Sequence, residues 1–205
     1  MRHLISALML LILLKVSGCR EEKFVPDPDD PRLPKYTESG NDVAGALISN
    51  VAWKTNLVIS YDVSPGSPPP FYIHNYPNAD SLIVRINGAI NEGINKGAPI
   101  YFAVGIRGTG VKAYQGLKNL KNKIFVIDGK TNYLTVEDLM MMYDGTTEIF
   151  KNGTGRFNIV NVQQRTNDTI LSGTFDFRFE TASGIIDVQK GRFDFVVSGK
   201  QYYSN

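Results

Sequence analysis

Alternation of apolar and polar side chains constrains the fold of this chain more than any other feature of its sequence. In the run 100–106 every second residue is apolar, and in 174–180 three phenylalanines alternate with polar or charged residues. A period of two places successive side chains on opposite faces of a β-strand. One face of each strand then packs in a core and the other faces water, as in an antiparallel sheet. The run 57–63 and the closing runs 186–188 and 193–197 follow the same rule.

Breaks in the alternation predict bulges and turns. The apolar phase changes at Lys190-Gly191, which predicts a β-bulge with a permissive backbone at Gly191, and it slips again at Ile159-Val160. Between the runs stand turn signals, namely Pro65-Gly66, Pro68 to Pro70, Asn87-Gly88, Asp128-Gly129, Asp144-Gly145, Asn152-Gly153 and Ser183-Gly184. The sequence therefore predicts an all-β antiparallel sandwich or partly closed barrel. Only 114–121 indicates a turn or two of helix, and 136–142 is ambiguous.

The first eighteen residues have the three zones of a signal peptide. A basic start at Arg2 precedes an apolar run over 4–14, and small residues follow. A helix of about 11 residues spans roughly 16 Å, which is too short for roughly 30 Å of hydrocarbon. The segment 1–18 is therefore predicted to be cleaved rather than to span a membrane.

The residues at the predicted cleavage site, Val16-Ser17-Gly18-Cys19, resemble the lipobox of bacterial lipoproteins. That resemblance implies cleavage after Gly18, a diacylglyceryl thioether on Cys19, and an acylated (palmitate-type) amine. The sequence departs from the usual pattern in having Val where Leu is commonest, and Lys15 close to the cut. The alternative is an ordinary secretory signal followed by an accidental cysteine.

Counts of cysteine and charge limit the partners of the mature chain. Cys19 is the only cysteine, so no disulfide can form within the chain, and stability must come from a packed core. The signal holds two of the 22 basic residues and none of the 20 acidic ones, so the mature chain has a formal net charge of zero. This balance gives no reason to expect nucleic acid or an anionic membrane surface as a partner. We expect a monomer.

The segment after the cut predicts a tether. Residues 20–34 are charged and contain four prolines, which favours an extended, solvated chain of about 50 Å. Asp27, Asp29 and Asp30 resemble part of a calcium loop, but the glycine and final glutamate of an EF-hand are missing. The expected organisation is therefore a signal peptide (1–18), a lipidated disordered tether (19–35), and one β domain (36–205).

A second resemblance concerns export. The order Arg20-Glu21-Glu22 is similar to the signal by which some Gram-negative lipoproteins reach the outer face of the outer membrane. It implies a protein that is lipid-anchored in the outer membrane and exposed at the cell surface. The alternative is that these charges only solvate the tether.

Motifs at both ends of the domain resemble an uncharacterised family of Gram-negative lipoproteins. The opening motif has Leu33-Pro34, then Thr37-Glu38-Ser39-Gly40, then Val51-Ala52-Trp53; the closing motif has Ser172-Gly173-Thr174-Phe175 and Gly191-Arg192-Phe193-Asp194. The chain departs from the family at 42–46, where a cysteine is common and none stands here. The family implies a lipoprotein with a β domain and has no activity to transfer.

Residue counts exclude most catalytic sites. His74 is the only histidine of the mature chain, so His-based or Cys-rich zinc sites cannot form within one chain. We expect no metal, no cofactor and no catalytic residue. Paired carboxylates would suffice for a glycosidase, but Asp176 and Asp194 both fall on predicted outward faces of strands, where solvated carboxylates are commonplace. The glycines of 105–110 imitate a dinucleotide-binding loop, but no helix follows them.

Aromatic residues beside a proline loop give the one indication of binding. Phe71, Tyr72 and Tyr76 follow Pro68 to Pro70, and exposed rings on a stiff loop are candidate ligand contacts. The alternative is that Phe71 and Tyr72 begin a buried strand. Asp80-Ser81-Leu82 and Asp168-Thr169-Ile170 resemble an O-glycosylation acceptor of some envelope proteins. The leading expectation is a non-enzymatic envelope module that binds or scaffolds a glycan or another envelope protein; the alternative is a carboxylate-dependent glycan hydrolase.

Replacement of the one cysteine tests the lipid anchor. Cys19→Ala removes the only thiol that can carry the diacylglyceryl group, so we expect uncleaved precursor or soluble protein in place of the membrane-bound form. Intact-mass measurement of the membrane fraction checks this. A wild-type N-terminus elsewhere, without added lipid mass, would contradict the assignment.

Overall fold

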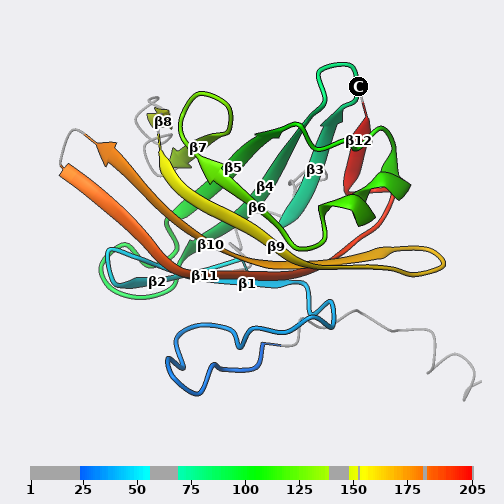
Figure 1. Ribbon diagram of the computed structural model, residues 1–205. Coiled ribbons are helices and arrows are strands. Elements are labelled where there is room, and N and C mark those ends of the chain that lie inside the picture. The colour runs from blue at the N-terminus through cyan, green and yellow to red at the C-terminus, as the bar shows by residue number, and fades with distance from the viewer. Residues whose placement is uncertain (1–23, 56–68, 139–147, 152, 182–183, 205) are drawn as a thin grey trace, which may run out of the picture.

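The computed structural model describes residues 24–55, 69–138, 148–151, 153–181 and 184–204, and more than half of them lie in strands (Figure 1). The strands are β1 (Val43–Ile48), β2 (Val51–Lys54), β3 (Phe71–Tyr76), β4 (Ser81–Ile90), β5 (Pro99–Arg107), β6 (Lys123–Ile127), β7 (Tyr133–Asp138), β8 (Glu148–Lys151), β9 (Thr154–Gln164), β10 (Thr169–Thr181), β11 (Gly184–Val197) and β12 (Tyr202–Ser204). A short 3₁₀ helix, η1 (Tyr114–Leu120), lies where the sequence predicts a turn or two of helix.

The described strands form one strongly curled sheet, an open half-barrel. Its order is β6-β9-β10-β11-β1-β2-β4-β5-β7-β8, and β3 pairs with β4 beside β2. Neighbouring strands are antiparallel, except that β12 lies parallel to β3. The predicted class, an all-β antiparallel sandwich or partly closed barrel, is confirmed. The curl lets one continuous sheet enclose its own core.

Side chains on the inner face of the curl fill this core. In β10 the rings of Phe175, Phe177 and Phe179 are at most 4% exposed, while the residues between them face outward, so the predicted phase is confirmed. Trp53 of β2 is fully buried against Phe102 of β5, with ring centroids 4.9 Å apart. Its indole Nε1 donates to a backbone carbonyl at 3.0 Å, so the one polar atom of the ring is satisfied.

Both predicted bulges are present. In β9, Val160 is the extra residue opposite Ser172 and Gly173, and in β11 two residues, Gln189 and Lys190, lie opposite the single residue Asp176 of β10. The positive φ at the second bulge belongs to Lys190 (53°), so the expectation that Gly191 supplies it is wrong. Gly191 is needed for another reason, because a Cβ there would lie 2.4 Å from the ring of Phe175.

The turn predictions are correct in one described place and wrong in another. Asp128-Gly129 forms a turn in which the Asp128 carboxylate accepts three backbone amides. Asn87-Gly88, expected as a turn, lies inside β4, and a Cβ on Gly88 would come within 2.5 Å of the Trp53 ring. The glycine therefore makes room for the indole. The run 57–63 and the turn signals at 65–66, 144–145 and 183 lie outside the described residues.

Of the run 136–142, whose type the sequence leaves ambiguous, residues 136–138 belong to β7 and the rest lie outside the described residues. Among the described residues no helix is long and apolar enough to cross a membrane.

Substitution of two neighbouring residues of β10 tests which side chains of the strand face the core. Phe177→Ala should lower the free energy of unfolding by about 3–5 kcal/mol, because the ring is 3% exposed and its removal leaves a cavity. Asp176→Ala should cost less than about 1 kcal/mol, because its half-exposed carboxylate makes only a surface ion pair with Arg156. Denaturant melts compare the two, and the reverse order would contradict the phase.

Candidate functional site

A row of aromatic rings lies on the outer face of β3 and β12. Burial alternates along β3, so Phe71, Ile73 and Asn75 point into the core and the residues between them point out. Tyr72, His74 and Tyr76 are those outward residues, and the parallel register places Tyr203 of β12 beside His74. Tyr203 is the most exposed of the four rings, at 41%.

The four rings contact one another in sequence. His74 stacks on Tyr203 with centroids 5.1 Å apart and lies 6.5 Å from Tyr76, nearly parallel to both rings. Tyr72 meets His74 edge-on at 5.3 Å and Tyr203 edge-on at 6.0 Å. Contacts of this kind stabilise ring pairs beyond simple burial, so the row is held in a defined arrangement.

A charged pair borders the rings. Arg85 of β4 lies opposite Tyr72 in the sheet, with its guanidinium 6.0 Å from the centroid of that ring. The same guanidinium binds both oxygens of Glu137 of β7, at 2.9 and 3.3 Å. We call Tyr72, His74, Tyr76 and Tyr203, with Arg85 and Glu137, the aromatic face.

The charge of His74 follows from its surroundings. Partial burial lowers its pKa from the usual 6.5, and the nearby Arg85 guanidinium lowers it further. The imidazole is therefore neutral at pH 7. Its Nδ1 has no hydrogen-bond partner among the described residues. A neutral ring between tyrosines offers an apolar surface with one polar edge.

The structure separates the three residues that the sequence proposes as ligand contacts. Tyr72 and Tyr76 lie on the aromatic face, and their role as contacts stays a prediction. Phe71 is 1% exposed and stacks on Phe195 in the core, with centroids 4.5 Å apart, so the expectation of ligand contact is wrong for this residue. Strand alternation gives the reason, because residues 71 and 72 must point to opposite faces. The segment 56–68 before the strand lies outside the described residues.

Sequence reasoning missed three members of the aromatic face, namely Arg85, Glu137 and Tyr203. Each comes from a different strand, and only strand order brings them together. The period-two pattern of β4 places Arg85 outward, but no sequence signal pairs it with Glu137. The residues that the two O-glycosylation motifs would modify, Ser81 and Thr169, lie in β4 and β10. Thr169 is fully buried, so it is not an accessible glycosylation site in the folded chain.

The second feature is the segment 24–35, which folds onto the outside of the sheet (Figure 1). The expectation that it stays extended and solvated is wrong for these residues. Asp27 pairs with Arg192 of β11, and both side chains are less than 15% exposed. Pro26 forms a β-bridge with Pro34, and Leu33 is fully buried against Leu47 and Ala52. Three of the charged residues, Asp27, Asp30 and Arg32, therefore have fixed partners.

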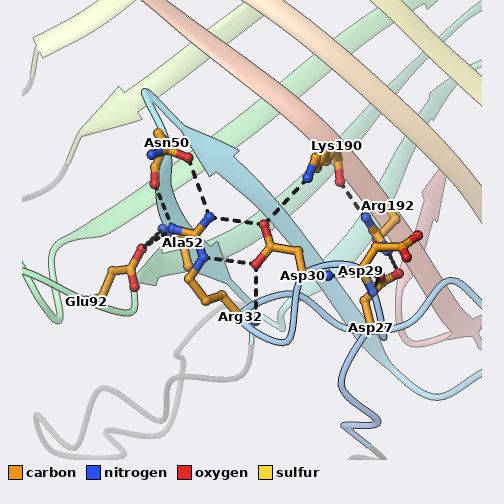
Figure 2. Close-up of polar contacts among 9 residues, drawn as sticks. All are labelled: Asp27, Asp29, Asp30, Arg32, Asn50, Ala52, Glu92, Lys190 and Arg192. Carbon is orange, nitrogen blue, oxygen red and sulfur yellow. Dashed lines mark hydrogen bonds and ion pairs between the residues drawn. The ribbon is translucent and has the colours of Figure 1, made fainter.

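Figure 2 shows how these charges are paired. Asp30 accepts two hydrogen bonds from Arg32, at 2.9 and 3.0 Å, and lies 3.6 Å from the amine of Lys190. Arg32 also reaches Glu92, which accepts the backbone amide of Ala52 at 2.8 Å. The carboxylates of Asp27 and Asp30 are thus part of a structural network, to which Asp29 contributes its backbone amide. No group of three metal-ligating side chains occurs in the described part of the chain.

A cleft of about 540 Å³ lies between this segment and the outer face of β10 and β11. Its lining includes Tyr36 and the carboxylates of Asp27, Asp29, Asp30 and Asp176. Burial alone would raise the pKa of Asp27, but hydrogen bonds from the Asp29 amide and from Arg192 outweigh it and lower the pKa. Hydrogen bonds from Arg32 lower the pKa of Asp30 to about 2, against a smaller effect of burial. These two groups are ionised at neutral pH.

The prediction that Asp194 is a solvated carboxylate is wrong. It is 2% exposed, because residues 37–41 cover the outer face of β11. Its carboxylate accepts hydrogen bonds from Thr37, from Ser172 at 2.8 Å, and from the backbone amides of three residues, Ser39, Gly40 and Asn41, at 3.2, 2.8 and 3.1 Å. The opening and closing motifs of the sequence therefore meet at this one side chain, in a structural role.

Comparison with known proteins returns no match: no protein-family model, no curated protein and no solved structure matches this chain.

Asp194 and Asp176 form a matched pair for measurement, because they lie on the same face of adjacent strands. Asp194→Ala should lower the free energy of unfolding by at least about 3 kcal/mol, because several buried donors lose their acceptor at once. Asp176→Ala serves as the control with little effect. Denaturant melts of both variants decide, and equal small losses would mean that the hydrogen bonds to Asp194 contribute little.

Proposed function

We propose that this chain is a lipid-anchored envelope protein whose β domain is a non-enzymatic binding module, with glycan bound on the aromatic face. The observation that carries the proposal is the contiguous row of Tyr72, His74, Tyr76 and Tyr203 on the outer face of two paired strands. Single aromatic rings at a protein surface are common and need no explanation, whereas contiguous ones mark interaction sites. The four rings are contiguous and one of them is 41% exposed, so they are a candidate interaction surface.

Glycan suits the chemistry of this surface. A sugar ring presents an apolar face of C–H groups and a rim of hydroxyls, which matches aromatic rings bordered by polar side chains. The Arg85–Glu137 pair offers donors and acceptors beside Tyr72, and its bidentate geometry holds both groups in place. Since His74 is neutral at pH 7, the rings carry no charge that would select an anion.

The alternative, a carboxylate-dependent glycan hydrolase, has less support. Such an enzyme needs one carboxylic acid that keeps its proton near neutral pH, together with a second, ionised carboxylate. In the cleft beside the segment 24–35, hydrogen bonds hold Asp27 and Asp30 ionised, and Asp176 pairs with Arg156 at 3.5 Å. These hydrogen bonds make Asp27 and Asp30 poor general acids.

The lipid anchor and the location rest on the sequence. Cys19 follows a signal peptide and a lipobox-like tetrapeptide, and Arg20-Glu21-Glu22 favours display at the outer face of the outer membrane. In this proposal the partners are the membrane, through the lipid on Cys19, and a glycan of the envelope. No metal or cofactor takes part.

Binding to an array of bacterial envelope glycans tests the proposal. The mature domain should be retained, and Tyr203→Ala and Tyr72→Ala should each weaken retention about tenfold, equal to about 1.4 kcal/mol of binding free energy. Thermal melts of the variants establish that the fold is kept. The rings are on the surface, so the loss should appear in binding rather than in stability.

Tyr36→Ala is the matched control, because Tyr36 lines the cleft and lies outside the aromatic face. It should retain full binding. Loss of binding in this variant, with unchanged binding in Tyr203→Ala, would move the ligand to the cleft and contradict the proposal. If the domain binds none of the glycans but binds an envelope protein immobilised on the same array, the partner is a protein and the proposal of glycan binding is wrong.

A further inference from the structure

The folded part of the chain extends closer to the lipid-bearing cysteine than the sequence indicates. Phe24 already contacts the domain, since the amine of Lys54 in β2 lies 4.0 Å from the centroid of its ring. The amide of Lys35 donates to the carbonyl of Val25 at 2.6 Å, and that of Asp27 to the carbonyl of Leu33 at 2.9 Å. The segment 24–35 is thus a small closed loop fastened at both ends.

Three kinds of contact hold this loop on the sheet. Leu33 is fully buried. The ion pair of Asp27 with Arg192 is largely buried, and such pairs are strongly destabilising to break because the remaining charge is left without a partner. Behind the loop, Asp194 fixes residues 37–41. Release of the loop would therefore disrupt several contacts together.

We infer that the tether between the lipid and the folded domain is only the four residues 20–23, so that the membrane lies against the side of the domain formed by the segment 24–35. The inference rests on the lipid anchor in the proposed function. The five Cα steps from Cys19 to Phe24 span at most about 18 Å, whereas a tether that ends at Tyr36 would span about 60 Å.

The partner of this side of the domain is the headgroup layer of the membrane into which the lipid inserts. The segment 24–35 contains three acidic and two basic residues, so it has no positive excess that would attract anionic lipid. The short tether alone keeps the domain close. Proximity should therefore not depend on salt, unlike electrostatic attachment.

A fixed side toward the membrane also directs the aromatic face. In Figure 1 the segment 24–35 lies below the sheet, and β3 and β12 lie at the upper side of the molecule. With the segment 24–35 toward the membrane, the strands of the aromatic face lie on the side of the domain away from the membrane. An anchored binding module needs this arrangement to reach a ligand.

Neutron reflectometry on supported bilayers tests the inference. The thiol of Cys19, the only one in the chain, is coupled to a maleimide-headgroup lipid in the mature protein, and the water layer between headgroups and protein is measured. We expect a layer no thicker than about 20 Å, unchanged between low and high salt. The control carries about twelve Gly-Ser residues between Lys23 and Phe24, and its layer should be thicker.

The inference would be overturned if the water layer of the native protein were as thick as that of the linker variant. It would also be overturned if the thickness of the native layer changed between low and high salt. Because the coupling is chemical, the result does not depend on whether cells attach lipid to Cys19. Absence of lipid on the cellular protein would contradict the proposed function while leaving this measurement unchanged, so the two failures are distinguishable.

Discussion

The buried carboxylate of Asp194 is the interaction on which the attachment of the N-terminal segment to the sheet depends. A carboxylate removed from water is costly unless donors surround it, and here the donors come from Thr37, Ser172 and the amides of residues 39–41. The strand β11, its neighbour β10 and the chain that enters β1 are thereby fixed relative to one another.

This attachment affects the segment that precedes it. Residues 24–35, which precede the fixed point, lie close enough to the sheet for Asp27 and Asp30 to pair with cations of β11, so that a proline-rich charged stretch becomes part of the fold. Away from this attachment, β12 pairs with β3 and completes the row of rings.

The sequence predicted the β class, the phase of β10 and both bulges, because alternation depends only on local residue order. It failed for Asp194, although the alternation correctly placed this side chain on the outer face of the sheet. What buries Asp194 is a segment about 155 residues away, and no local pattern reports such cover. The aromatic face shows the same limit. The outward phase of Tyr72 and Tyr76 is a local property, whereas Tyr203 joins them through a parallel pairing of the last strand that strand alternation does not specify.

Amide hydrogen exchange at Gly40 tests most directly the claim that the N-terminal segment belongs to the folded domain through Asp194. The Gly40 amide donates to this carboxylate at 2.8 Å, so it should exchange at least about 100-fold more slowly than in an unstructured chain, as protected amides do. Ser39 and Asn41 should show similar protection, while the amide of the exposed Gly93 should not. Exchange of Gly40 at the rate of an unstructured chain, in an otherwise folded protein, would contradict the account.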